Sequence, residues 1–286
     1  MNGALGKSVQ VIPLQAGECF NFAAITGRGE PWRVKSFPAG FTLLVHPERG
    51  PVLFDTGYSS LVMRLMRRWP GVLYGLVTPV KLDERDTAKA QLARLGWSAA
   101  DIREIVVSHL HADHVGALRE FPQARFLLDA PAFTALRELR GVKAVRRAFL
   151  PELLPDDFAA RMQPLLFSPA PVGVAPFTEV ADVFGDNSVL AVRVPGHAPG
   201  MIALITRTHP QATWNGDGTG LTLLAADAAW SVRALREGIP VHPLGRLAFW
   251  NVAQEAESAR KLREWLTTHP NAQVIVSHDA PEVHRV

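Results

Sequence analysis

The sequence predicts an α/β protein in which β-sheets are covered by helices. The chain has 286 residues, of which 48% are hydrophobic and 20% are charged, a balance typical of a globular protein with a large core. Short apolar runs alternate with segments of helical periodicity. The alternation occurs in two comparable halves, which favours sheets flanked by helices. We expect one domain that covers residues 1–286.

Strands are expected where short apolar runs are bounded by turn residues. In the first half these runs cover residues 9–13, 41–45, 52–54, 105–107 and 125–128. Helices are expected where apolar residues recur at helical spacing, which they do in 86–95, ending at Gly96, and in 131–139. A capping-box pattern at Ser98–Asp101 predicts one more short helix.

The second half repeats this alternation. Strands are expected at residues 189–194, 201–205, 222–225 and 273–276. Residues 253–265 have the pattern of an amphipathic helix. Residues 140–187 are less regular and contain several prolines. This segment is expected to form either a helical insert that lines a pocket or a variable surface excursion.

Charge and cysteine content narrow the function classes. Lys and Arg number 30 and Asp and Glu number 27, and the Arg residues are spread along the chain. A nucleic-acid binder usually shows a basic stripe, so we expect no nucleic-acid partner and only a modest attraction for anionic ligands or membrane surfaces. Cys19 is the only cysteine, which excludes an intramolecular disulfide and a cysteine-based zinc finger.

Targeting signals are not evident in the sequence. The first ten residues contain one Lys and no long apolar block, so no secretory signal is expected. The longest apolar stretch, residues 71–80, has about half of the ~20 residues that a spanning helix needs. We expect a cytoplasmic protein with no membrane span.

Four potential metal ligands occur within six residues, directly after the expected strand at 105–107. They are His109, His111, Asp113 and His114. His109 and His111 face the same way if the extended geometry continues, whereas Asp113 and His114 follow a turn and can face a second point. This density favours two adjacent metal sites over the alternative of solvated polar residues on a loop.

The pattern His109-x-His111-x-Asp113-His114 resembles the signature of the metallo-β-lactamase fold superfamily. Other elements of that family are matched in order along residues 53–279. They are Asp55-Thr56-Gly57 after a strand, Gly196-His197, Asp227 at a strand end and His278 near the C-terminus. The resemblance implies a four-layer αββα sandwich of two mixed β-sheets flanked by helices.

The resemblance also implies a role for each matched residue. One metal ion would be bound by His109, His111 and His197, and a second by Asp113, His114 and His278. Asp227 would bridge the two ions, and Asp55 would orient a ligand histidine. Imidazole and carboxylate ligands suit zinc, which we expect, and also manganese, iron or cobalt. Asp113 or Asp227 would relay a proton.

Within the superfamily, the flanks of these motifs resemble the N-acyl homoserine lactonases. The likeness lies in residues 78–82, 95–97, 108–111 and 277–279. It implies a dinuclear metal-dependent hydrolase that uses a metal-bridging hydroxide on a lactone or another carboxylic ester, a small-molecule substrate. Trp230 stands where that group usually carries Tyr, and Met201 stands where many relatives have a second His.

Two other functions are kept as alternatives: a phosphotriester or phosphodiester hydrolase of the same fold, and a non-catalytic metal-binding protein. Trp230, Met201, Trp69 and Tyr74 are candidates for a substrate pocket. Trp69 and Tyr74 belong to the apolar segment 61–80, which could instead pack in the core or at a homodimer contact. The remaining histidines are expected at the surface; they are His46, His209, His242, His269 and His284. Of these, His242 and His284 are weak candidates for the rim of the pocket.

Overall fold

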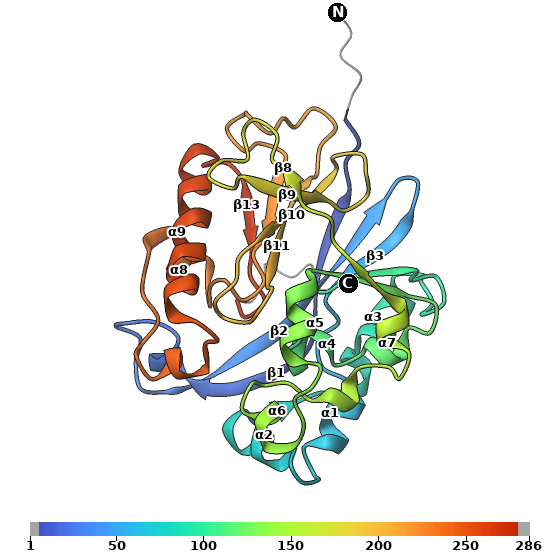
Figure 1. Cartoon of the computed structure of the whole chain (residues 1–286), viewed down its shortest axis with the longest axis vertical. Coiled ribbons are helices and arrows are strands. Elements are labelled where there is room, and N and C mark those ends of the chain that lie inside the picture. The colour runs from blue at the N-terminus through green and yellow to red at the C-terminus, as the bar shows by residue number, and fades with distance from the viewer. Residues whose placement is uncertain (1–5, 280–286) are drawn as a thin grey trace, which may run out of the picture.

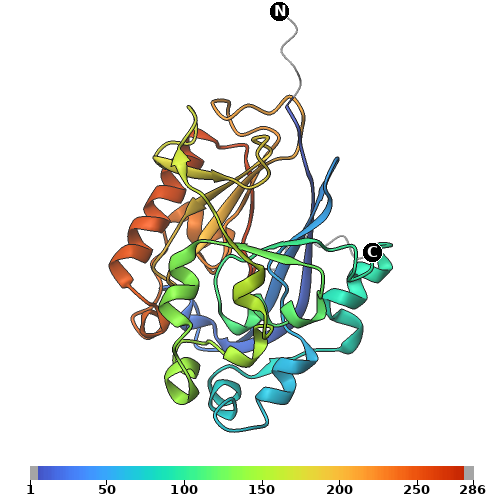
Figure 2. The same ribbon diagram turned by 45° about the vertical axis from the view of Figure 1, so that its right-hand side comes forward.

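Two β-sheets pack against each other and helices cover their outer faces (Figure 1). The computed structural model describes residues 6–279. Within these residues the first sheet has seven strands in the order β4-β1-β2-β3-β5-β6-β7, and the second has six in the order β13-β12-β11-β10-β9-β8. Helices α1 to α7 lie on the side of the first sheet, and α8 and α9 cover the second (Figures 1 and 2). The four-layer αββα sandwich expected from the sequence is confirmed.

The first sheet is built on a long antiparallel pair. Strand β1 runs antiparallel to β2, β2 antiparallel to β3, and the next three strands run parallel to β3. The strands are β1 (Gln10–Phe22), β2 (Val34–His46), β3 (Gly50–Phe54), β4 (Val80–Lys81), β5 (Glu104–Val106), β6 (Arg125–Leu128) and β7 (Met162–Pro164). Strands β5 and β6 are largely buried on both faces, which explains their apolar residues, whereas β7 at the sheet edge is exposed.

The second sheet is antiparallel except at one edge. Strands β8 to β12 pair antiparallel in chain order, and β13 adds to β12 in parallel. The strands are β8 (Ser168–Pro169), β9 (Glu179–Asp182), β10 (Val189–Arg193), β11 (Ile202–Arg207), β12 (Leu221–Leu224) and β13 (Gln273–Ile275). Because β13 is parallel to β12, the residues that follow both strands emerge at the same edge.

The helices are short, apart from the last one. They are α1 (Ser60–Leu65), α2 (Val72–Val77), α3 (Ala88–Arg94), α4 (Ala112–Val115), α5 (Ala130–Leu136), α6 (Gly141–Val145), α7 (Phe158–Arg161), α8 (Val232–Glu237) and α9 (Val252–Thr268). Side chains of Ser59, Thr87, Ser231 and Asn251 cap four of them by accepting bonds from backbone N–H groups. None of the helices described between residues 6 and 279 is long and apolar enough to cross a membrane.

The core has three layers that match this architecture. The middle layer lies between the sheets, where Phe54 and Val106 of the first sheet and Leu204 and Leu224 of the second are buried together. Two outer layers lie between each sheet and its helices. We infer from the shared middle layer that the chain forms one domain, since neither sheet buries its inner face alone.

The structure corrects the expected helix at Ser98–Asp101. These residues form a turn in which the backbone N–H and the hydroxyl of Ser98 both donate to Asp101 Oδ2, each at 2.7 Å. The capping interaction is therefore present, but strand β5 begins at Glu104 and leaves no room for a helix.

The segment 140–187 is helical only in its first part, as α6, a 3-10 turn at Pro151–Leu153 and α7. The rest supplies β7, β8 and β9, which belong to both sheets. This segment therefore connects the two sheets. Strand β7 pairs with β6, which ends more than thirty residues earlier in the sequence, so the local pattern gives no signal for it, whereas β9 pairs with the nearby β10.

Two histidines expected at the surface are buried. Nδ1 of His46 accepts the N–H groups of Glu48 and Arg49 at 3.1 Å, and Nε2 lies 2.8 Å from Asp186. His269 stacks on Trp265 with ring centroids 4.2 Å apart. Each is therefore a packed structural residue, whereas His209 is exposed, His242 is half-buried and His284 lies outside the described residues.

Candidate metal centre

The four ligands of the sequence motif are positioned by the end of β5 and the start of α4. The chain leaves the first sheet at Val106 and enters α4 at Ala112. His109, His111, Asp113 and His114 are all buried there. Strand β12 and strand β13 end nearby and are followed by Asp227 and His278, which are also buried.

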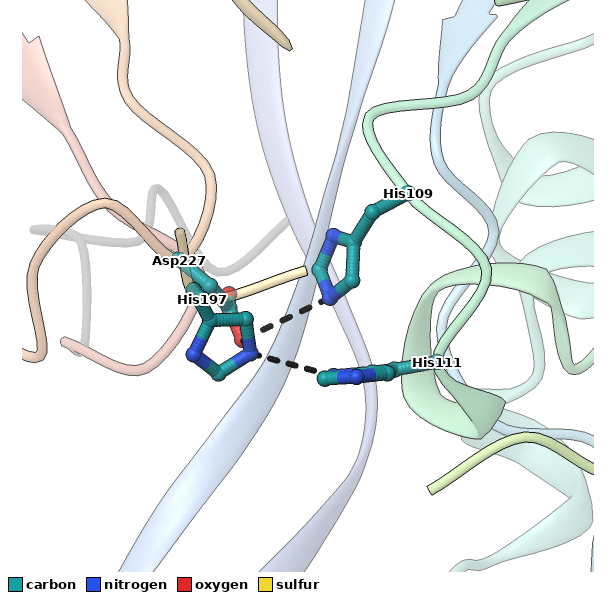
Figure 3. Close-up of side chains that lie close together, drawn as sticks. All are labelled: His109, His111, His197 and Asp227. Carbon is teal, nitrogen blue, oxygen red and sulfur yellow. Dashed lines mark hydrogen bonds and ion pairs between the residues drawn. The ribbon is translucent and has the colours of Figure 1, made fainter. Parts of the chain in front are cut away.

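The first group of side chains contains His109, His111, His197 and Asp227. His109 and His111 approach from one side and His197 and Asp227 from the other (Figure 3). Nε2 of His197 lies 3.0 Å from Nδ1 of His111 and 3.3 Å from Oδ2 of Asp227. Nε2 of His109 lies 3.9 Å from the same oxygen. Three imidazoles and one carboxylate thus converge on one point.

The second group contains Asp113, His114, His278 and again Asp227. Nε2 of His278 lies 3.0 Å from Asp227 Oδ2 and 3.6 Å from Asp113 Oδ2. Nε2 of His114 lies 3.2 Å from Asp227 Oδ1 and 3.6 Å from Asp113 Oδ2. In each group the ligand atoms all lie within 4.8 Å of one another. Asp227 is common to both groups, so two cations held there would be neighbours.

Several buried polar atoms at this centre lack a hydrogen-bond partner among the described residues. They are Nε2 of His109, Nε2 of His114, Nδ1 of His197 and Oδ1 of Asp227. Leaving such atoms unsatisfied in the interior is unfavourable by about 1–3 kcal/mol each. Nitrogen and carboxylate oxygen are ligand atoms for divalent transition metals, so the residues present fit a pair of such ions.

The opposite nitrogens of three imidazoles are held by neighbouring groups. Nδ1 of His114 lies 2.8 Å from Oδ2 of Asp55, and Nδ1 of His278 lies 2.9 Å from the carbonyl oxygen of Pro38. The hydroxyl of Ser108 donates to Asp55 Oδ2 at 2.7 Å and lies 2.9 Å from Nδ1 of His109. Such contacts direct the remaining nitrogen of each ring towards the centre. The sequence predicts this role for Asp55; it gave no sign of Pro38, whose carbonyl belongs to the distant strand β2.

The charges at the centre are set by burial and by the carboxylates. Burial lowers the pKa of His109 well below its ordinary value and lowers the pKa of both His111 and His197 to about 3, so these rings are neutral near pH 7. Burial opposes protonation of His278 too, but Asp227 outweighs it and raises the pKa of His278 to about 8. Burial likewise disfavours a charged Asp227, yet the facing His278 and His114 hold its pKa well below its ordinary range.

Tight backbone approaches bring the remote ligands into place. Gly196 has a φ of 131°, and a Cβ there would lie 2.0 Å from the backbone nitrogen of Glu255 in α9. Asp55 and Ala226 have φ values of 63° and 47°, a region that non-glycine residues rarely adopt. The strained positions lie at Asp55 itself and directly before Asp227, where strain of this kind is often found in functional sites.

The candidate pocket residues occupy different environments. Trp230 stacks on His278, with ring centroids 4.8 Å apart, and so lies at the centre. Met201 is buried in the core outside the second sheet. Tyr74 is buried with its hydroxyl 3.0 Å from that of Tyr58, while Trp69 is 72% exposed. Trp230 is thus the candidate that stacks on a metal-ligand candidate.

Comparison with known proteins agrees with this arrangement. The model of the metallo-beta-lactamase superfamily matches residues 37–209. A protein named N-acyl homoserine lactonase AttM, from Azorhizobium caulinodans, is 30% identical over 95% of this chain and 93% of its own length. A protein named N-acyl homoserine lactonase, from Bacillus cereus, is 23% identical over 82% of this chain and 80% of its own length.

A solved structure of a mutant of AiiA from B. thuringiensis, with N-decanoyl-L-homoserine bound at its active site, has the same fold. It matches with a TM-score of 0.72 and 20% sequence identity, over 97% of this chain and 94% of the other. The fold and the extent of the family match together identify the superfamily of the chain. The chain belongs to the metallo-β-lactamase superfamily and is a metal-dependent hydrolase.

Proposed function

We propose that this protein is a dinuclear metal-dependent hydrolase that opens lactones. The observation that carries the proposal is the pair of buried His/Asp groups that share Asp227. Its relatives named N-acyl homoserine lactonase align along 95% of the chain, which supports a lactone as the substrate. Related carboxylic esters share the same reacting group and belong to the same proposal.

We assign His109, His111 and His197 to one ion, Asp113, His114 and His278 to the other, and Asp227 to both. Two divalent ions, zinc by preference, would supply Lewis acidity towards the substrate carbonyl and a hydroxide nucleophile near neutral pH. The protein contributes their spacing, because Asp227 is fixed between His114, His197 and His278. It also excludes bulk water, because these residues are buried.

Proton transfer to the leaving alkoxide is assigned to Asp113 or Asp227. Asp227 lies within 3.3 Å of three imidazoles, so its oxygens are committed to the ligand set. Among the described residues, the carboxylate of Asp113 stays at 3.6 Å from both His114 and His278. The looser arrangement leaves Asp113 better able to accept and return a proton.

Trp230 replaces the tyrosine usual in the lactonase group as a donor to the substrate carbonyl. The chain has only two tyrosines, Tyr58 and Tyr74, and their hydroxyls bond to each other in the core. No phenol is therefore free to take over that position. The indole N–H of Trp230 can donate a hydrogen bond but cannot give up a proton at neutral pH. We expect Trp230 to orient the substrate and not to act as an acid.

The test is the initial rate of the zinc- or manganese-loaded protein on lactones of increasing acyl length, followed with a pH indicator. We expect turnover of one lactone class and its loss in His109→Ala. His209→Ala removes an exposed imidazole far from the motif and serves as the matched control. If the fully metallated protein turns over no lactone, the substrate assignment is wrong, and phosphotriesters and aryl esters become the next substrates to measure.

A further inference from the structure

Basic side chains gather at one end of the molecule. Helices α1, α2 and α6 lie together there in both views (Figures 1 and 2), and α2 contacts α6. Residues 60–81 and 137–147 contain nine Lys and Arg and one acidic residue, Glu138, whereas the whole chain has 30 and 27. The arginines that look dispersed in sequence are therefore concentrated by the fold.

Six of these cations are exposed and have no carboxylate within ion-pair distance among residues 6–279. They are Arg64, Arg67, Arg68, Arg140, Lys143 and Arg146. Some cations elsewhere on the surface are paired: Arg260 of α9 bonds to Glu257 and Glu264. These six side chains thus present positive charge at the surface outside any ion pair with the described residues.

Large apolar side chains are exposed between these cations. Trp69, Leu76 and Val77 are each 72% exposed, and Val72 and Val142 are also exposed. Single apolar residues on a surface are ordinary, but a contiguous group marks a contact surface. We call these five apolar residues and the six cations the basic apolar face.

We propose that the basic apolar face docks onto an anionic phospholipid surface. A tryptophan, protruding aliphatic side chains and flanking Lys and Arg are the chemistry that binds the interface of an anionic bilayer without crossing it. A second copy of this chain, if it met the same face through a twofold axis, would bring like charges together. Nucleic acid would satisfy the cations but offers no partner for Leu76 and Val77.

The face is connected to the metal centre by one short chain of contacts. The guanidinium of Arg147, directly after α6, stacks over the ring of Trp250 at 4.6 Å. The backbone N–H of Trp250 donates to the carbonyl oxygen of His197 at 3.1 Å. Docking would therefore place the centre close to the lipid. On the proposed function, this favours substrates whose acyl chains partition into membranes.

The experiment is co-sedimentation of the zinc-loaded protein with vesicles of phosphatidylglycerol and phosphatidylcholine in equal parts, and with vesicles of phosphatidylcholine alone. We expect binding to the anionic vesicles that weakens as salt is added, and little binding to the neutral ones. Each cation near such a surface increases the partition coefficient onto the vesicles by about fivefold. Arg67→Ser with Lys143→Ser should therefore lower this coefficient by about 25-fold. Leu76→Ser with Val77→Ser should lower it as well.

Matched controls are available elsewhere on the surface. Lys89→Ser with Arg103→Ser removes two exposed cations, and Leu166→Ala truncates a side chain that is 82% exposed. These controls should bind vesicles like the wild type. Thermal unfolding verifies that every variant is folded.

Three results would overturn the proposal, and none depends on the lactonase assay. The first is no binding to anionic vesicles, and the second is equal binding by face and control variants. The third is another occupant of the face. If sedimentation velocity shows a dimer that Leu76→Ser with Val77→Ser dissociates, the face is a contact between two copies of the chain. If the protein shifts DNA in a gel, and this binding is lost without the cations but kept without Leu76, the face binds nucleic acid.

Discussion

The carboxylate of Asp55 orients a candidate metal ligand without being a ligand itself. Its two oxygens accept the backbone N–H and the hydroxyl of Ser108, and one of them lies 2.8 Å from Nδ1 of His114. An ion bound by His114 is then held by a ring whose orientation is fixed. The positive φ of Asp55 places its side chain back over Ser108, a conformation that Asp and Asn tolerate better than other residues.

Asp55→Asn should lower zinc affinity by about 10–100-fold. The amide keeps the size and tolerates the backbone, but it cannot accept all three hydrogen bonds as the carboxylate does. Competition titration with a chromogenic chelator measures the change. Asp101→Asn is the matched control, because Asp101 also accepts the N–H and the hydroxyl of a serine but is exposed and remote. Equal affinities for the two variants would contradict the role given to Asp55.

The thiol of Cys19 should be almost unreactive in the folded protein. Burial, together with the nearby negative charge of Asp113, raises the pKa of Cys19 to about 12. Below that pH the neutral thiol dominates, so reactivity is low at pH 8 and rises only as the pH approaches 12. A disulfide reagent at pH 8 should modify the native protein at least ~100-fold more slowly than the protein in urea. Equal rates would show that the thiol is accessible and ionised.

Helix α9 packs against the loop that carries His197 and so positions it. Gly196 has no room for a side chain, because its Cβ would fall on the backbone of Glu255. The helix cap residue Asn251 is also bonded to this loop. The backbone N–H of Asn251 donates to the carbonyl oxygen of Gly196 at 2.9 Å. The position of His197 therefore depends on how α9 packs on the second sheet.

Gly196→Ala should destabilise the protein by about 2–4 kcal/mol, because it combines a strained φ with a backbone clash. Gly185→Ala is the control: Gly185 also has a positive φ, but its Cβ would meet nothing within 4 Å. The control should lose only about 1 kcal/mol. Urea unfolding gives both values, and a Gly196→Ala variant as stable as the control would refute the packing argument.

At the scale of elements, the sequence predicts best where local pattern and burial agree. The runs 52–54, 125–128 and 222–225 contain strands whose residues, apart from the exposed Arg125, are buried on both faces. The pattern at Ser98–Asp101 predicts a helix, yet it forms a turn because β5 begins three residues later. Strands β7 and β8 are two or three residues long and exist only through their partners, so no local signal could predict them.

In the molecule as a whole, the candidate metal ligands could be predicted from the sequence, but the contacts that hold these ligands in place could not. The motif at 109–114 has a recognisable spacing, and the family pattern locates His197, Asp227 and His278. The carbonyl of Pro38 and the packing of Gly196 on Glu255 arise only when distant segments meet. The same holds for the basic apolar face, whose two halves are separated by more than fifty residues in sequence.

Removing the metal should lower the thermal stability of the whole chain. A ligand that binds only the folded state stabilises it by about 4 kcal/mol at ~1,000 times its Kd. For a chain of this size that corresponds to roughly 10 °C in Tm. A thermal melt with and without a strong chelator measures the effect. The chelator should shift His109→Ala much less, and an unchanged wild-type Tm would mean that no structural cation is bound.

Two ions are proposed to lie side by side at Asp227. An anomalous difference map from zinc-soaked crystals, measured at the zinc absorption edge, would locate them. We expect two peaks next to Asp227, one among His109, His111 and His197 and the other among Asp113, His114 and His278. A single peak in fully loaded protein, or peaks away from these residues, would contradict this proposal.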